Sequence, residues 1–221
     1  GIALGATLLV TTVLWLDGGS NGLPQDVTSS LRDYRSFWQT LRDSAFTVIS
    51  MQTTTGYGTA DFDSWPQFCR VLCMALAVIG PCAGSTGGGI KLVRFMIVAK
   101  AALGGVRRFV RPRAVQSLRM DGEALGEPVV ASVTGYFALW VFVLMGGTLF
   151  LTAFGTDLET AGSAVLATLN NIGPGLHLVG GTQSYDHFHD LVKIVLSLFM
   201  ILGRLEFYAL VALCVPGFWQ R

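Results

Sequence analysis

Charged residues are scarce in this chain. Only 13% of its 221 residues are charged, against about 25% in soluble domains, and 52% are hydrophobic. Cysteine and histidine are also rare, with four and three copies. The cysteines lie in apolar runs, which favours buried thiols over a disulfide framework, and the histidines lie in one loop apart from them, which argues against a zinc site. The composition therefore predicts a membrane protein.

Acidic residues are absent from residues 91–119, a stretch that holds eight lysines and arginines. Because basic loops of membrane proteins stay in the cytoplasm, we expect the loop at residues 100–127 to be cytoplasmic. A nucleic-acid patch is the competing interpretation. A basic loop between two apolar segments is, however, ordinary membrane topology, so we expect no nucleic-acid partner.

Long apolar runs supply the candidate spanning helices. A spanning helix needs about 20 apolar residues. Residues 129–154 and 191–216 are long enough to span, and residues 1–16 resemble the second part of a spanning helix. Residues 68–98 form one more apolar run, which is interrupted in its middle by five glycines and a proline between residues 80 and 89.

The interruption has a functional and a structural interpretation. Each interior glycine costs a helix about 1 kcal/mol relative to alanine, and such breaks are found where the backbone lines an ion path. The phosphate-loop pattern G-x-x-x-x-G-K-[ST] nearly fits residues 84–91. Ile90 stands where that pattern needs lysine and no strand precedes it, which argues against nucleotide binding here.

Two short polar-capped segments precede glycine turns. Residues 36–39 read S-x-x-Q and residues 156–159 read T-x-x-E, both of which are capping boxes that begin helices, expected to end near residues 52 and 169. These helices are too short to span. A short helix followed by a glycine-rich return is typical of a re-entrant pore loop, and an interfacial amphipathic helix is the alternative. The turns that follow contain Gly56 and Gly58, and Gly173 and Gly175.

The first turn, Thr-Thr-Gly-Tyr-Gly at residues 54–58, is close to the Thr-Val-Gly-Tyr-Gly filter of potassium channels. Carbonyls that all face one way require alternating ordinary and left-handed residues, and glycine adopts the left-handed conformation at little cost. We therefore predict left-handed glycines at Gly56 and Gly58. A simple glycine-rich turn between two helices is the alternative.

The two halves of the chain repeat one pattern, and we predict an all-α membrane protein of two tandem helix–pore-helix–filter–helix repeats. The repeats are expected at residues 1–110 and 128–221, joined by a cytoplasmic linker at 111–127. Arg70 and Lys193 are each followed by nine apolar or small residues and then by Gly80 and Gly203. Both predicted filters fall on the non-cytoplasmic side, opposite the basic loop.

Five motifs, in order along the chain, resemble the C-terminal half of the TrkH/KtrB superfamily of potassium transporters, covering its third and fourth repeats. They are Thr-Thr-Thr-Gly-Tyr with the following Ala-Asp and Trp-Pro, Gly-Ser-Thr-Gly-Gly-Gly-Ile-Lys, Asn-Asn-Ile-Gly-Pro-Gly, Leu-Gly-Arg-Leu-Glu, and Pro-Gly-Phe-Trp near the end.

The resemblance implies a pore of four repeats in one chain, each giving a quarter of the filter, with K⁺ as the transported ion and no cofactor. Two walls cannot close a ring, so an N-terminal half or a second copy must complete it. Because the two walls differ in sequence, we expect preference for potassium over sodium without extreme discrimination. The potassium-binding backbone would come from Thr54, Thr55, Gly56, Tyr57, Asn171, Ile172, Gly173 and Pro174.

The resemblance also implies a gate. A charge at a helix centre costs about 2.5–3.5 kcal/mol on insertion scales, so Arg204 needs a polar cavity or a counter-charge. The resemblance implies a place beside the pore below the filter, although a salt bridge to another helix is the structural alternative. Lys91 and Arg94 follow the loop, and positive-inside anchoring is the favoured interpretation of both, with signalling of the loop's state to a cytoplasmic partner as the alternative. The expected gate consists of the interrupted-helix loop and two basic residues, namely Gly84, Gly87, Gly88, Gly89, Lys91 and Arg204.

The remaining expectations concern the cell. The resemblance implies a multi-pass protein of the bacterial inner membrane, in contact with lipid, homodimeric at full length, and served by a cytoplasmic nucleotide-binding regulatory subunit. We expect a transport protein and not an enzyme. The rival interpretations are a non-conducting membrane scaffold, in which glycines only allow close helix packing, and an alternating-access cation symporter. Asp61 and Asp63 either concentrate cations at the outer mouth or cap a loop.

Overall fold

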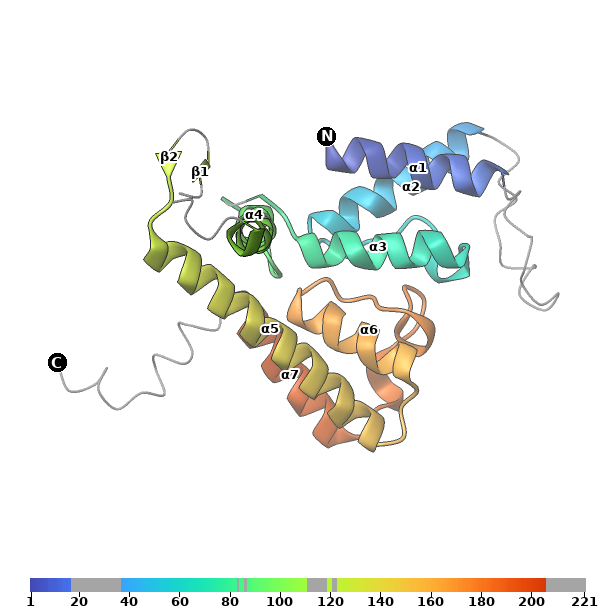
Figure 1. Cartoon of the computed structure of the whole chain (residues 1–221). Coiled ribbons are helices and arrows are strands. Elements are labelled where there is room, and N and C mark those ends of the chain that lie inside the picture. The colour runs from blue at the N-terminus through green and yellow to red at the C-terminus, as the bar shows by residue number, and fades with distance from the viewer. Residues whose placement is uncertain (17–36, 83, 86, 111–118, 121–122, 206–221) are drawn as a thin grey trace.

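The chain is described by a computed structural model that covers residues 1–16, 37–82, 84–85, 87–110, 119–120 and 123–205 (Figure 1). It is mostly helical, as the sequence predicts. Seven α-helices are joined by three short 3₁₀ turns and one two-stranded hairpin. They are α1 Ile2–Leu16, α2 Phe37–Gln52, η1 Phe62–Ser64, α3 Gln67–Ile79, α4 Leu92–Val110, β1 Arg119–Met120, β2 Glu123–Ala124, α5 Glu127–Ala153, α6 Leu158–Leu169, η2 His177–Val179, η3 Tyr185–His187 and α7 Asp190–Leu205.

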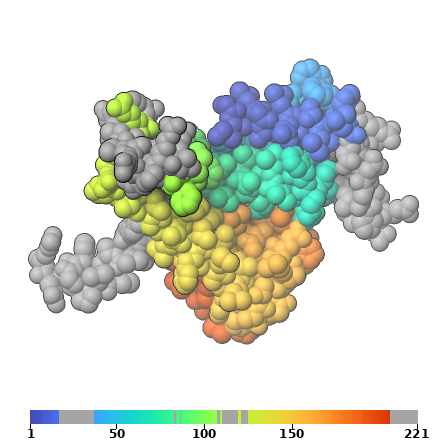
Figure 2. All heavy atoms as spheres, viewed as in Figure 1, coloured from blue at the N-terminus to red at the C-terminus, as the bar shows by residue number. Residues whose placement is uncertain are grey.

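Six of the seven described α-helices form two groups of three, and α4 lies beside the second group. In the first group α2 packs against both α1 and α3, and in the second α6 packs against both α5 and α7. Contacts between α3 and α6 join the groups, which lie one above the other in Figure 1 and are directly packed in Figure 2. The short helices α2 and α6 thus occupy equivalent places in their groups.

Each group has its own apolar core, and each core includes a residue from outside its own group. The first core, with Val10, Val48 and Cys69 at its centre, also contains Ile172 from the turn after α6. The second core, built around α5, α6 and α7, also contains Ile90 from the segment before α4, which is fully buried. Burying an isoleucine stabilises a fold by about 1.5–3 kcal/mol. These two isoleucines therefore fix the turn after α6 and the segment before α4 relative to both groups.

One described helix, α5, is long and apolar enough to cross a membrane, whereas α1, α3 and α6 are shorter apolar helices. It matches the run predicted at residues 129–154. Its outer face exposes Phe142, Met145 and Leu149, an apolar surface that water would solvate poorly. The run predicted at residues 191–216 begins as α7, and its part beyond residue 205 lies outside the described residues.

The helix starts differ from the predictions in one respect. The capping box at residues 36–39 begins outside the described residues. At α6 the cap is Asp157 and not Thr156, so that prediction was wrong by one residue. Asp157 has an extended backbone, and its carboxylate accepts the N–H of Thr160 at 2.9 Å. A carboxylate one residue later is the better acceptor for the free N–H groups of the first turn.

The interrupted run forms two helices that run in different directions. Helix α3 ends at Ile79 and α4 begins at Leu92. In Figure 1 α4 is seen end-on while α3 lies across the view, and α4 packs against α5. The guanidinium of Arg94 lies 4.4 Å from the ring centre of Tyr136, which is buried in α5. Arg94 therefore fastens α4 to the second group.

Candidate functional site

The turn after α2 closes in a Schellman arrangement. The N–H of Thr55 donates to the carbonyl of Ser50 at 2.9 Å, and the N–H of Thr54 donates to Met51 at 3.2 Å. Thr54 itself is left-handed, with φ of +56°. This position usually holds glycine, and a β-branched residue there is strained by about 1–3 kcal/mol.

The turn after α6 repeats this geometry. The N–H of Ile172 donates to Ala167 at 2.9 Å, and the N–H of Asn171 donates to Thr168 at 3.1 Å. Asn171 is left-handed, with φ of +54°. Asn171 therefore corresponds to Thr54 and Ile172 to Thr55, with the same spacing from the end of the preceding helix.

A second left-handed residue follows two positions later in each turn. Gly56 has φ of +78° and Gly173 has φ of +102°. Left-handed residues at alternate positions turn successive carbonyls to a common side, which is the geometry predicted for a filter. The left-handed conformation predicted for Gly56 is confirmed, whereas the one predicted for Gly58 was wrong. Gly175, at the equivalent position of the second turn, is not left-handed either.

Gly175 is required for packing instead. A Cβ there would lie 2.7 Å from Val179 and 3.0 Å from the hydroxyl of Ser163. The first left-handed residue of each turn is supplied by the helix end, so only the second needs glycine.

The two turns touch each other. A Cβ on Gly56 would overlap the carbonyl oxygen of Ile172 and would lie 3.1 Å from Pro174. Since Gly56 is also left-handed, both space and backbone conformation require glycine at this position. The structure thus brings the two predicted filter segments into direct contact, at the junction of the two helical groups.

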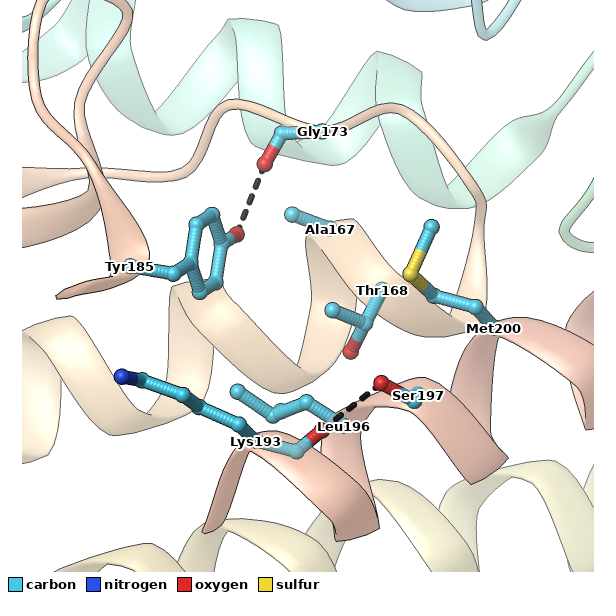
Figure 3. Close-up of a pocket in the computed structure, with 8 residues that line it drawn as sticks. All are labelled: Ala167, Thr168, Gly173, Tyr185, Lys193, Leu196, Ser197 and Met200. Carbon is cyan, nitrogen blue, oxygen red and sulfur yellow. Dashed lines mark hydrogen bonds between the residues drawn. The ribbon is translucent and has the colours of Figure 1, made fainter. Parts of the chain in front are cut away.

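Two carbonyls of these segments accept hydrogen bonds from hydroxyl groups. Ser50 donates to the Tyr57 carbonyl at 2.6 Å, and Tyr185 donates to the Gly173 carbonyl at 2.7 Å (Figure 3). Burial raises the pKa of Tyr185 to about 12, so its hydroxyl is protonated and can donate at neutral pH. The Tyr57 ring is mostly exposed.

The glycine-rich loop packs against both turns. A Cβ on Gly87 would lie 2.7 Å from the Thr54 hydroxyl, and one on Gly89, which has φ of +79°, would lie 2.6 Å from the side-chain oxygen of Asn170. Gly88 approaches the Asn170 carbonyl closely enough that a Cβ would overlap it. Gly84 has no such neighbours. Three of the four predicted gate glycines therefore lie beneath the two turns, and the fourth lies in open space.

Helix α7 meets the same place from the other side. A Cβ on Gly203 would overlap the Leu169 carbonyl, and the side-chain amide of Asn171 donates to the Met200 carbonyl at 3.0 Å. Arg204, next to Gly203, is exposed. Lys91, at the far end of the loop, is partly buried. A Cβ on Gly88 would also lie 3.2 Å from the side-chain amide nitrogen of Asn171, so Asn171 is a common neighbour of the loop and of α7.

A cluster of ion pairs lies at the other end of α3. Arg70 forms an ion pair with Asp63 at 2.8 Å and another with Glu159 in the first turn of α6. The second oxygen of Asp63 accepts the N–H of His177 at 3.1 Å. Asp61 caps η1 and accepts the Thr182 hydroxyl. Both acids predicted at the outer mouth are therefore bonded to neighbouring loops, and Arg70 and Glu159 are residues that the sequence analysis did not select.

A cavity of about 260 Å³ lies between α6, α7 and the second turn (Figure 3). Gly173 and Tyr185 line one end, and Lys193 lies at its edge. Within the described part of the chain, no group of three or more histidine, cysteine or acidic side chains is placed to hold a metal ion. The polar groups at the centre of the site are therefore mostly main-chain carbonyls and small hydroxyls.

Known proteins resemble this chain in sequence and in fold. A family model described as a cation transport protein, TrkH, matches residues 9–219. The Trk system potassium uptake protein TrkH of Salmonella typhimurium is 36% identical over 221 residues, which is 100% of this chain and 42% of that protein. Its counterpart from Vibrio parahaemolyticus is 40% identical over 187 residues, covering 85% of this chain and 38% of that protein.

A solved structure agrees. The crystal structure of the potassium transporter TrkH from Vibrio parahaemolyticus matches with a TM-score of 0.76 at 35% identity, over 98% of this chain and 45% of that one. The fold and the relatives define a helical membrane protein of a cation-transport family. The chain belongs to the TrkH family, and it spans less than half the length of the relatives it matches.

Proposed function

We propose that this chain supplies two adjoining walls of a potassium-selective filter in a potassium uptake protein. The first wall is the turn after α2 and the second is the turn after α6. The observation that carries the proposal is their matched geometry: left-handed residues at Thr54 and Gly56, and again at Asn171 and Gly173. A left-handed residue at a helix end is common, but a scaffold that needed glycine only for close helix packing would have no reason to repeat two left-handed residues at alternate positions in both turns.

The carbonyls of these turns would act by replacing water around the ion. Carbonyl dipoles take over the hydration shell of K⁺, and selection against Na⁺ depends on their number and spacing. The contact between Gly56 and the Ile172 carbonyl sets the distance between the two walls. Because one wall carries Tyr57 where the other carries Pro174, the two are unequal, and we infer a moderate preference for potassium.

The gate would be the glycine-rich loop together with Arg204. Gly87 and Gly88 already lie against Thr54 and Asn170, at the base of both walls. In this arrangement the loop narrows the path, while Arg204, one residue after the contact of Gly203 with Leu169, repels cations. Lys91 lies where the loop joins α4 and would connect its position to the cytoplasmic side.

Two walls do not close a filter. The relatives are more than twice as long as this chain, and we propose that the remaining walls come from another part of a longer polypeptide or from a second copy. The whole assembly would be a homodimer in the bacterial inner membrane, with its basic linker facing a nucleotide-binding regulatory subunit in the cytoplasm.

The test is uptake of Rb⁺ or K⁺ into liposomes by the intact protein that carries this chain, beside its Gly56→Ser variant. We expect the variant to lose uptake or to admit Na⁺, because the new side chain would displace Ile172. Gly155→Ala is the matched control: Gly155 is also left-handed, with φ of +84°, but has no neighbour within 4 Å of a Cβ. Equal effects of the two variants would assign the loss to backbone strain alone and would count against a filter at Gly56.

A second variant tests the gate. Arg204→Ala should raise the leak of cations through the closed protein. Unchanged leak would remove Arg204 from the gate and leave the filter assignment standing. If the wild-type protein takes up neither ion when its partner and nucleotide are supplied, the proposed function is wrong and a scaffold is the better interpretation.

A further inference from the structure

Helix α2 carries a fully buried carboxylate behind the first turn. The side chain of Asp43 is 0% exposed. Its Oδ1 accepts the hydroxyl of Thr59 at 3.0 Å and faces the guanidinium of Arg42 at 3.3 Å. Burying a charged group is costly unless it is paired and hydrogen-bonded. A carboxylate that is buried despite this cost is typical of a residue with a specific structural or functional role.

Asp43 shares its helix face with another residue that contacts the segment following the first turn. Ser50 lies seven positions later, two turns along α2, and donates to the Tyr57 carbonyl at 2.6 Å. Tyr57 and Thr59 are alternate residues of this outgoing segment. The helix therefore fixes the segment at two points, and Asp43 fixes the one further from the glycine-rich loop.

In the second half of the chain, hydroxyl groups and a histidine ring make the corresponding contacts. Thr160 occupies the position in α6 that Asp43 occupies in α2, counted from the matching left-handed residues. Its hydroxyl pairs with the His177 ring at 3.0 Å. Ser163 bonds both the N–H of Leu176, at 3.0 Å, and its carbonyl, at 3.3 Å. A buried carboxylate is therefore a property of the first wall and not of the shared architecture.

We propose that Asp43 is a positioning residue that sets the ion preference of the first filter wall by holding Thr59. This inference rests on the proposed function. Asp43 does not touch the ion path. It fixes the segment that leaves the filter, so the carbonyls of residues 54–56 keep the spacing that favours a dehydrated K⁺ over Na⁺. Without the carboxylate this segment keeps its contact with Ser50 but loses the one at Thr59, so its outer end can contract around the smaller ion.

The experiment measures Rb⁺ uptake by the intact protein in liposomes, with Na⁺ as competitor. The variants are Asp43→Ala, Thr59→Val and their double mutant, with Thr59→Ser as the conservative replacement. We expect each single variant to lower the preference for Rb⁺ over Na⁺ by about tenfold, equivalent to about 1.4 kcal/mol. The double mutant should lower this preference no further than the more severe single variant does, because both substitutions remove the same hydrogen bond between Asp43 and Thr59. Thr59→Ser should keep the wild-type preference.

Asp190→Asn controls for the loss of one acidic charge. Asp190 begins α7, is 91% exposed, and pairs only at 3.7 Å with Lys193. If Asp43→Ala does not fold, Thr59→Val against Thr59→Ser decides the question, since Thr59 is exposed and its replacement leaves the buried core of α2 unchanged. Unchanged ion preference in Thr59→Val, or multiplied effects in the double mutant, would overturn the inference. Absence of uptake by the wild-type protein would instead refute the proposed function.

Discussion

Arg70, in the first turn of α3, forms an ion pair with Glu159, in the first turn of α6, and so joins the two helical groups at the end of α3 away from the glycine-rich loop. The same guanidinium pairs with Asp63 at 2.8 Å. The contact holds the start of the second short helix, α6, to a residue that is far away in the sequence. Any movement between the two helical groups must strain or break this ion pair.

Replacing Arg70 with alanine should loosen this junction. Exposed ion pairs are worth about 0–1 kcal/mol and buried ones cost about 3–5 kcal/mol to break, so we expect a loss of about 1–3 kcal/mol for this 15% exposed guanidinium. Thermal unfolding in detergent measures it. Lys193→Ala is the control, because Lys193 follows the same sequence pattern but pairs only with an exposed acid. Equal stability of the two variants would show that Arg70 does not join the groups.

At Gly203, helix α7 approaches the end of α6 closely. We expect Gly203→Ala to destabilise the protein by about 1–3 kcal/mol, as overpacked cores do, because its Cβ would overlap the Leu169 carbonyl. Gly146→Ala is the matched control, since Gly146 is also in a helix and has open space around it. The control should be neutral or stabilised by up to about 1 kcal/mol. If Gly203→Ala is as stable as that control, the close approach of the two helices is not required.

Asn170 is fully buried, and its side-chain amide has no hydrogen-bond partner among the described residues. An unpaired buried amide costs about 1–3 kcal/mol, and the glycine-rich loop packs directly over it. We expect Asn170→Leu to raise the unfolding temperature and to slow Rb⁺ uptake, because an apolar side chain favours the packed position of the loop. A variant that is less stable than wild type, or that transports faster, would contradict this.

Asp157 makes the cap of α6 sensitive to acid. Burial alone would raise its pKa, but hydrogen bonds from Thr160 and the nearby His177 hold the pKa below its ordinary value. The stabilisation is therefore present above the pKa of an unfolded aspartate, about 3.9, and is lost as the pH falls through the lower native pKa.

We expect Asp157→Ala to lower stability at neutral pH by about 1 kcal/mol, as the loss of a helix cap does. Asp157→Asn should keep most of the cap and lose its acid sensitivity. Circular dichroism of unfolding between pH 6 and pH 3 compares the three proteins. The same decline with acid in Asp157→Asn as in wild type would assign the sensitivity to another group.

The helices and turns were predictable where one local signal decides the structure. The apolar run at residues 129–154 appears as α5, within two residues at each end. Gly56 and Gly173 are left-handed, as the glycine turns indicated. Thr54 could not be predicted from its own residue type, because a β-branched residue disfavours that conformation and only the closing bonds of α2 impose it.

The contacts between the halves were not predictable from one sequence. The overlap of Gly56 with Ile172 and the ion pair of Arg70 with Glu159 join residues that are distant in the chain, and neither residue type indicates its partner. In the sequence, Asp43 is only one polar residue of a short helix. Its burial depends on Thr59 arriving from the far side of the turn, which the helical pattern does not contain.

The matched but differently built turns after α2 and α6 have a genetic consequence. In a pore assembled from identical subunits, one altered codon changes every side of the filter at once, so most such changes are lethal to function. In the proposed filter, a changed codon for Thr54 or for Asn171 would alter one of this chain's two walls and leave the other as it is. Selection could adjust ion preference in small increments, one wall at a time, and the buried carboxylate behind only one of the two turns would be a difference of that kind.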